Sequence, residues 1–282
     1  MSVIETHETA PTRFIEANGI RYAYRRFGKE FGVPLVFLQH FRGTMDNWDP
    51  MITNGFAQDR PVVLFDNAGV GLSGGETPDN VADMARHAVA FIGALGLMQV
   101  DLLGFSLGGF VAQQVTLGHP DLVRRVVLAG TGPQGGEGMD RFTPAVEAVA
   151  TKEKSGPDSL LFLFFEPTAT SQAAGRAFLQ RLGARTTDRD EPSSLQTRDA
   201  QLKAIQAWGV PEGERYARLK QIRQPVFVAN GTNDIMVPTV NSFILSQRLP
   251  NAYLILYPDS GHGFLFQYAE LFVEHVSRFL RS

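Results

Sequence analysis

The sequence contains no cysteine. This absence excludes disulfide bonds, thiolate metal sites and a cysteine nucleophile. The sequence also has little excess charge, and its net charge of −3 at pH 7 gives no electrostatic basis for binding nucleic acid or an anionic membrane. Long hydrophobic runs are missing too: the most conspicuous, residues 160–165, is far shorter than the roughly 20 residues of a membrane-spanning helix. We therefore expect neither a nucleic-acid nor a membrane partner.

The polar N-terminus lacks the basic start and the apolar stretch of a signal peptide, so we expect a cytoplasmic protein. The sequence shows no cluster of metal ligands, and the pair Gly69-x-Gly71 lacks the rest of a dinucleotide-binding fingerprint. We therefore expect no metal and no cofactor, and a small-molecule substrate as the partner. Whether the protein forms a homodimer is left open.

Apolar segments alternate with helical patterns along most of the chain. Two alternating segments flank Asn18-Gly19, which predicts a β-hairpin. Continuously apolar runs, typical of strands buried on both faces, follow at residues 34–39, 61–66, 100–105, 123–129, 225–230 and 252–257. Helical patterns occur at residues 81–95, 110–117, 240–248 and 268–280. This order predicts an α/β fold, with a mostly parallel twisted sheet covered by helices on both faces.

Residues 133–219 interrupt this rhythm, because they are polar and helical and contain no buried-strand pattern. We interpret them as a helical lid inserted into a core made of residues 1–132 and 220–282. Its aromatic side chains line a substrate pocket or pack the lid onto the core. The candidates for the pocket wall are Phe162, Phe164, Phe165 and Trp208, together with Phe264 and Phe266 near the C-terminus.

A Gly-x-Ser-x-Gly pattern at residues 104–108 lies between a predicted strand and a predicted helix. A serine on such a tight strand-to-helix turn has a strained backbone, and the glycines leave room for it. The turn exposes the hydroxyl of Ser106 and directs the following N–H groups at a bound group. We therefore predict that Ser106 is a nucleophile. The competing interpretation is an incidental serine in a glycine-rich turn.

A nucleophilic serine needs a base, usually a histidine that a carboxylate orients. His262 directly follows the last predicted strand, so it should lie at the same edge of the sheet as Ser106. Asp234 is the only carboxylate in the loop after the preceding strand, and the order serine, aspartate, histidine is typical of this motif. Asp259 is nearer to the histidine in sequence, but we interpret it as a turn residue.

The oxyanion of the reaction needs two N–H donors. We expect one from Leu107, the residue after the nucleophile, and the other from the loop at residues 39–43. Counting two residues past His40 selects Arg42, whereas a shorter loop selects Phe41. The sequence leaves both residues open.

These motifs resemble those of the α/β-hydrolase fold family over nearly the whole chain. Residues 40–43, with Trp48 shortly after, are similar to the family's histidine–glycine oxyanion loop, and residues 66–73 to its Asp-x-Arg-Gly-x-Gly-x-Ser loop. The details resemble the branch that holds small esterases, enol-lactone hydrolases and cofactor-free haloperoxidases. Two residues depart from the pattern: Phe41 stands where glycine is usual, and Ala68 replaces a structural arginine. The resemblance also implies a structural role for the histidine of the first loop.

The resemblance implies a serine hydrolase that cleaves a carboxylic ester or lactone through an acyl-enzyme, with Ser106, His262 and Asp234 as the catalytic triad. A haloperoxidase-like perhydrolase and a carbon–carbon bond hydrolase would use the same triad. A serine at the elbow argues against haloalkane dehalogenases and epoxide hydrolases, which use aspartate there. A non-catalytic receptor on this fold is the alternative from another class, and a complete triad favours turnover over mere binding.

Overall fold

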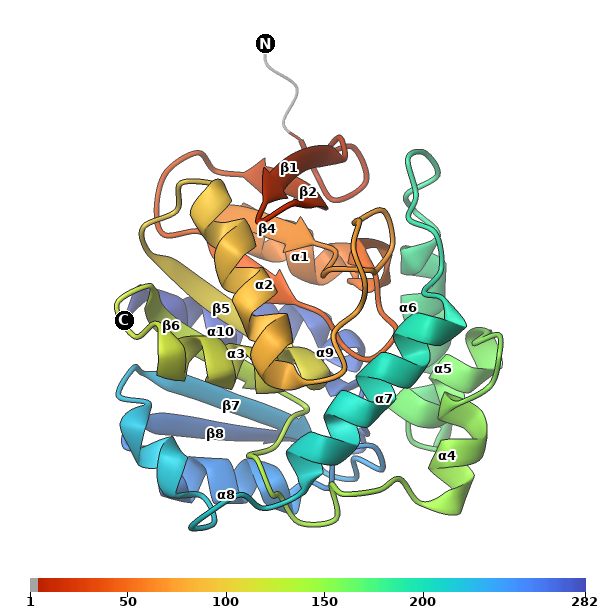
Figure 1. Ribbon diagram of the computed structural model, residues 1–282. Coiled ribbons are helices and arrows are strands. Elements are labelled where there is room, and N and C mark those ends of the chain that lie inside the picture. Colours follow the sequence, from red (N-terminus) through yellow and green to blue (C-terminus); the bar gives the residue numbers. More distant parts are fainter. Residues whose placement is uncertain (1–4) are drawn as a thin grey trace.

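The computed structural model describes residues 5–282, so the first four residues of the polar N-terminus lie outside it. Within the described residues, an eight-stranded sheet has the strand order β1-β2-β4-β3-β5-β6-β7-β8 (Figure 1). β1 and β2 pair antiparallel, β2 and β4 also pair antiparallel, and every other pair is parallel. The strands are β1 (Arg13–Ala17), β2 (Ile20–Gly28), β3 (Leu35–Leu38), β4 (Pro61–Phe65), β5 (Val100–Phe105), β6 (Val123–Ala129), β7 (Val226–Gly231) and β8 (Ala252–Tyr257).

The apolar runs of the sequence form the strands that they predicted. Every residue of β3, β4, β5 and β7 is buried, as expected for strands covered on both faces. The β1–β2 hairpin turns at Asn18 and Gly19, whose φ angles of 51° and 77° fit the positive values that this turn requires. The predicted sheet, with its antiparallel start, is confirmed.

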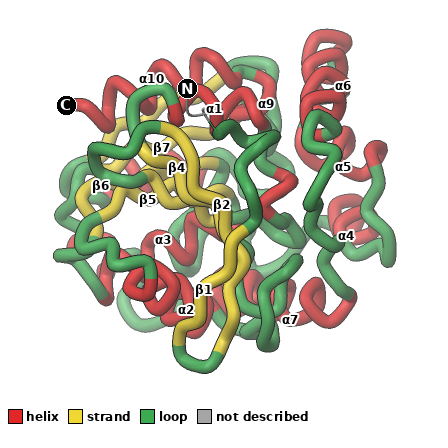
Figure 2. Tube along the Cα trace, turned by 90° about the horizontal axis from the view of Figure 1, so that it is seen from above, coloured by secondary structure: helices red, strands yellow, loops and turns green. Residues whose placement is uncertain are grey.

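Helices cover both faces of the sheet. α2 and α3 pack together on one face, and α1 and α10 pack together on the other (Figure 2). The helices outside residues 133–219 are α1 (Pro50–Ala57), α2 (Val81–Ala94), α3 (Leu107–Gly118), α8 (Val240–Arg248), α9 (Phe264–Gln267) and α10 (Ala269–Arg281), with 3₁₀ turn η1 at Met45–Asn47. The layered architecture confirms the predicted fold class.

Helices alone occupy the interruption between β6 and β7. They are α4 (Pro144–Ala150), α5 (Pro157–Phe164), α6 (Ala169–Leu182) and α7 (Leu195–Gly209), followed by the 3₁₀ turn η2 (Ala217–Gln221). Figure 1 shows α4 to α7 grouped at one side of the sheet. The cavity that contains Ser106 is walled in part by residues of this segment, which we call the insertion.

Candidate active site

Ser106 lies on a sharp turn between β5 and α3. Its φ of 57° and ψ of −119° are strained values for a residue with a side chain. A Cβ atom at Gly104 would collide with the carbonyl of Gly108, and one at Gly108 would collide with the carbonyl of Leu38. Glycine is therefore required at both positions, and the local geometry is that of the predicted elbow.

His262 and Asp234 form a buried pair at the same edge of the sheet. His262 Nδ1 and Asp234 Oδ2 are 2.7 Å apart, and the two side chains are 1% and 0% exposed. The other carboxylate oxygen of Asp234 accepts hydrogen bonds from the backbone N–H groups of Met236 and Val237 at 2.8 and 3.0 Å. The carboxylate is thus fixed by several donors, and it fixes the imidazole in turn.

Within residues 5–282, no hydrogen bond or ion pair joins Asp259 to His262. Its carboxylate accepts hydrogen bonds from the hydroxyls of Thr168, at 2.8 Å, and Thr170. These bonds, with Thr170 contributing most, lower the pKa of Asp259. Asp259 therefore joins its own turn to the start of α6, outside the pair described above.

The loop after β3 places His40, Phe41 and Arg42 in the wall of the cavity that Ser106 also lines. His40 Nδ1 lies 2.8 Å from the Phe41 carbonyl oxygen, so this nitrogen carries the proton and donates. Burial chiefly, and then the neighbouring His262, lower the pKa of His40 to about 4. The backbone N–H of Arg42 donates to Gln201 Oε1 at 2.7 Å. His40 is thus a neutral residue that holds the loop, and the N–H of Arg42 is already occupied.

The N–H groups of Phe41 and Leu107 have different surroundings from that of Arg42. Neither donates a hydrogen bond to another group within residues 5–282. Leu107 is the first residue of α3, where backbone N–H groups have no partner within the helix. Phe41 and Ser106 line the same cavity. Of the two residues that the sequence left open, the geometry therefore favours Phe41 over Arg42 as the second oxyanion donor.

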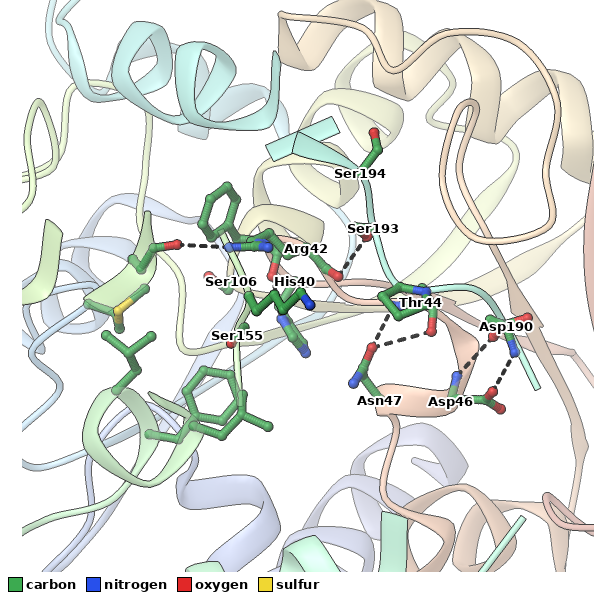
Figure 3. A pocket seen from close by; sticks show the side chains of 18 of the residues that line it. His40, Arg42, Thr44, Asp46, Asn47, Ser106, Ser155, Asp190, Ser193 and Ser194 are labelled. Carbon is green, nitrogen blue, oxygen red and sulfur yellow. Dashed lines mark hydrogen bonds between the residues drawn. The ribbon is translucent and has the colours of Figure 1, made fainter. Parts of the chain in front are cut away.

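A cavity of about 590 Å³ contains Ser106 and His262. Figure 3 shows Asp46, Asn47 and Asp190 grouped to one side of Ser106 and His40. The remaining wall comes largely from the insertion: Ala150, Glu153, Lys154, Ser155, Leu160, Leu163, Phe164, Arg189, Pro192, Ser193, Ser194 and Leu195. A second, much smaller pocket of about 20 Å³ opens beside Ser106 and is lined mainly by apolar side chains, including Phe110, Met139 and Phe142. Ser106 lies between an apolar recess and a larger cavity with a polar far wall.

The structure places none of Phe162, Phe165, Trp208 and Phe264 at the wall of this cavity, so that expectation is wrong for all four. Phe162 is 43% exposed at the surface, and Phe165 packs on Phe178. Trp208 stacks on Phe110 and donates to a backbone carbonyl, and Phe264 packs between Tyr257 and Phe272.

Phe164 is the aromatic residue of α5 that does line the cavity, with its ring 5.4 Å from that of His262. The helical period explains the difference. Residues 160, 163 and 164 share one face of α5, whereas residue 162 points away from it. Sequence reasoning missed the wall residues Asn47 and Met236, and it missed Arg189 and Asp190 in an irregular loop that carries no pattern.

A buried cluster of charges includes the wall residues Asp46 and Asp190. Arg25, from β2, binds Asp46 at 2.5 Å and Asp190 at 3.3 Å. The two aspartates also accept each other's backbone N–H groups, at 2.7 and 3.1 Å. Burial, and then the charge of Asp190, raise the pKa of nearby Asp66 well above its usual range. Position 68 holds a buried alanine where the family usually has arginine, and the cations of this cluster include Arg25 and Arg185, whose Nε lies 3.8 Å from Asp46 Oδ1.

Comparison with known proteins agrees with the fold described above. Residues 33–269 match the model of the α/β hydrolase fold. The chain belongs to this family.

Three relatives illustrate the range of proteins in this family to which the chain is similar. An α/β hydrolase fold protein from Chitinophaga pinensis has a solved structure that superposes with a TM-score of 0.94 and 48% identity, covering 99% of this chain and all of its own. A RutD protein of Rhizobium rhizogenes, provisionally named a carbamate hydrolase, is 27% identical over 251 residues, covering 85% of this chain and 89% of the relative. A pimeloyl-[acyl-carrier protein] methyl ester esterase of Nitrosomonas europaea is 30% identical over 184 residues, or 60% of this chain and 67% of the relative. The protein is a hydrolase.

Proposed function

We propose that the protein is a serine hydrolase that cleaves a carboxylic ester or lactone through an acyl-enzyme on Ser106. The observation that carries the proposal is the strained elbow of Ser106 in the same cavity as His262, whose Nδ1 lies 2.7 Å from Asp234. A carboxylate at Nδ1 leaves Nε2 as the basic nitrogen, which is the arrangement that activates a serine hydroxyl.

In this mechanism His262 takes the proton of Ser106 as the hydroxyl attacks the carbonyl carbon. The N–H groups of Phe41 and Leu107 stabilise the oxyanion, since both are free to donate. The imidazolium then protonates the leaving alcohol. In the second half, His262 removes a proton from water, and the resulting attack releases the acid and regenerates Ser106.

The shapes and linings of the two pockets favour a substrate with a small apolar group on one side of the scissile carbonyl and a polar group on the other. The recess beside Ser106 has room only for a short apolar group. In the far wall of the larger cavity, Asn47 Oδ1 accepts hydrogen bonds from the N–H and hydroxyl of Thr44, so the amide group of Asn47 keeps one orientation. Its N–H₂ group remains a donor for a hydroxyl or carbonyl of the substrate. We infer that the insertion acts as a lid over this cavity.

A panel of substrates tests the proposal. We expect turnover of short-chain p-nitrophenyl esters or lactones by the pure protein, and a loss on the order of 10⁴- to 10⁶-fold in Ser106→Ala with an unchanged melting temperature. The panel includes a carbamate, because a relative carries that name, and a peracid assay and a vinylogous diketone for the two alternative chemistries. Ester and lactone turnover within tenfold of the parent in Ser106→Ala would contradict the proposal.

A further inference from the structure

The loop that carries the proposed oxyanion donor contains a strained turn. Gly43 N–H donates to the His40 carbonyl at 3.1 Å, which closes a four-residue turn. Arg42, at the third position of this turn, has a φ of 63°. Glycine or asparagine is usual there, because a side chain is strained at positive φ. Something outside the turn must stabilise arginine in this conformation.

Residues of the insertion provide that stabilisation, because they form hydrogen bonds with every polar group of Arg42 except Nε. The backbone N–H donates to Gln201 Oε1 of α7 at 2.7 Å. The carbonyl accepts from Ser193 Oγ at 2.8 Å (Figure 3). The guanidinium donates to three carbonyls at the end of α4, those of residues 150, 152 and 153, at 3.4, 2.6 and 2.9 Å. A cation is also favoured at this end of a helix by the helix dipole.

The same contacts fix the peptide unit between Phe41 and Arg42. Its carbonyl accepts from His40 Nδ1 at 2.8 Å, and its N–H donates to Gln201 on the other side. A planar unit held at both ends cannot rotate. The N–H of Phe41 lies on the preceding peptide unit, which shares the Cα of Phe41 with this one, so fixing this unit limits the directions in which that N–H can point.

We propose that Arg42 is a positioning residue that couples the insertion to the oxyanion hole. The hole is complete only while α4, α7 and the loop at Ser193 are docked on the turn. Displacement of the insertion releases Arg42 from positive φ and turns the Phe41 N–H away from Ser106. This proposal rests on the proposed function, because it presumes an oxyanion at Ser106.

The experiment compares Arg42→Ala with a matched control, Arg198→Ala. Arg198, on α7, donates to the Thr151 carbonyl at the end of α4 at 2.7 Å, so its removal loosens the same helix end without touching the turn. The measurements are kcat and KM for p-nitrophenyl butyrate, the inhibition constant of an alkyl boronic acid, and the melting temperature. The boronate adduct of the serine carries an oxygen in the oxyanion hole and so reports on the hole itself.

Outright loss of one oxyanion donor lowers kcat by about 10²- to 10³-fold, so a displaced donor in Arg42→Ala should lower it by about 10- to 100-fold. We expect KM to stay within about threefold and the boronate inhibition constant to rise by a factor similar to the loss in kcat. Arg42→Gly should recover part of kcat, because glycine adopts positive φ without strain. Arg198→Ala should keep kcat within about twofold of the parent.

Three results would overturn the coupling. They are a kcat in Arg42→Ala within threefold of the parent, an unchanged boronate constant, or equal losses in Arg42→Ala and Arg198→Ala. If Arg42→Ala does not fold, Ser193→Ala removes one contact to the same turn and should show the same pattern at about three- to tenfold. A rise in KM confined to anionic substrates would instead assign Arg42 to substrate binding. Failure of the proposed function is recognised separately, as parent turnover that does not depend on Ser106.

Discussion

At the scale of single residues, the partners of each carboxylate distinguish Asp234 from Asp259. Asp234 contacts His262, while Asp259 is tied to two threonine hydroxyls of α6. Asparagine at position 234 would keep the shape but favour the wrong imidazole tautomer, so we expect Asp234→Asn to lose on the order of 10⁴ in kcat. Steady-state kinetics should show Asp259→Asn close to the parent, and a reversed ranking of the two variants would refute the assignment.

A second residue-scale prediction concerns acid stability. His7 is buried against Thr53, with Nδ1 and Oγ1 2.9 Å apart, and burial chiefly lowers its pKa from 6.5 to about 4. The charges of Arg25 and Arg185 also lower this pKa, whereas Asp46 and Glu8 raise it. The unfolded chain therefore binds the proton more tightly. The stability associated with neutral His7 is complete above pH 6.5 and is lost as the pH falls through about 4.

The loss associated with His7 should reach about 3 kcal/mol at full protonation. We expect His7→Gln to show a smaller decrease in unfolding free energy between pH 6.5 and pH 4 than the parent, measured by urea denaturation. His119→Gln, at an exposed position, serves as the control and should follow the parent curve. Identical pH dependence in all three proteins would show that His7 is not the group that titrates.

At the scale of elements, α5 presents one face to the active site and the other to solvent. Phe164 is 4% exposed and packs on His40, Phe105 and His262, whereas Phe162 is 43% exposed. We expect Phe164→Ala to lose about 3–5 kcal/mol of unfolding free energy and Phe162→Ala to change it by less than about 0.5 kcal/mol. Thermal or urea unfolding measures both, and equal effects would mean that α5 is oriented differently.

The sequence predicted the positions of the strands and helices better than it predicted which side chains of a helix line the cavity. Runs of apolar residues located β3 to β8, and alternating segments around Asn18-Gly19 located β1 and β2. The helix α8 begins and ends where its pattern does. The first helix after β3, α1, was missed because it has only eight residues, although Asp49 accepts from Met51 N–H as an N-cap and Pro50 occupies the first turn. The wrong assignment of Phe162 to the pocket came from composition alone, since the period of α5 already separates it from residues 160, 163 and 164. Phe165 follows the last residue of α5 in extended conformation and packs on Phe178.

At the scale of the whole molecule, the buried cluster around Arg25 joins parts of the chain that are far apart in sequence. Arg25 on β2 binds Asp46 after β3 and Asp190 in the insertion, and it is fully buried. Removing one partner of a buried ionic network leaves uncompensated charges, so Arg25→Ala should lose about 3–5 kcal/mol of unfolding free energy. Urea denaturation measures this loss. Arg21→Ala, at an exposed position of the same strand, should stay within about 0.5 kcal/mol, and a similar value for Arg25→Ala would contradict the role of the cluster.

The same long-range contacts mark the limit of sequence reasoning about the site. Ser106, Asp234 and His262 were predicted because each follows a strand, and parallel strands end at one edge of the sheet. The polar far wall of the cavity was not predicted, because it brings together residues such as Asp46 and Asp190, which lie 144 positions apart in the sequence. Likewise, the choice between Phe41 and Arg42 depended on Gln201, which is 159 positions from Arg42. Local patterns contain no signal for such pairs.

The most direct test of the proposed mechanism is the detection of an acyl-enzyme. The protein is mixed with p-nitrophenyl butyrate, quenched in acid within the first turnovers, and analysed by mass spectrometry intact and after digestion. We predict a butyryl group on the peptide that contains Ser106, and none in Ser106→Ala. Turnover with no adduct under conditions that trap acyl-enzymes of a reference serine esterase, or an adduct on another residue that persists in Ser106→Ala, would contradict the assignment of Ser106 as the nucleophile.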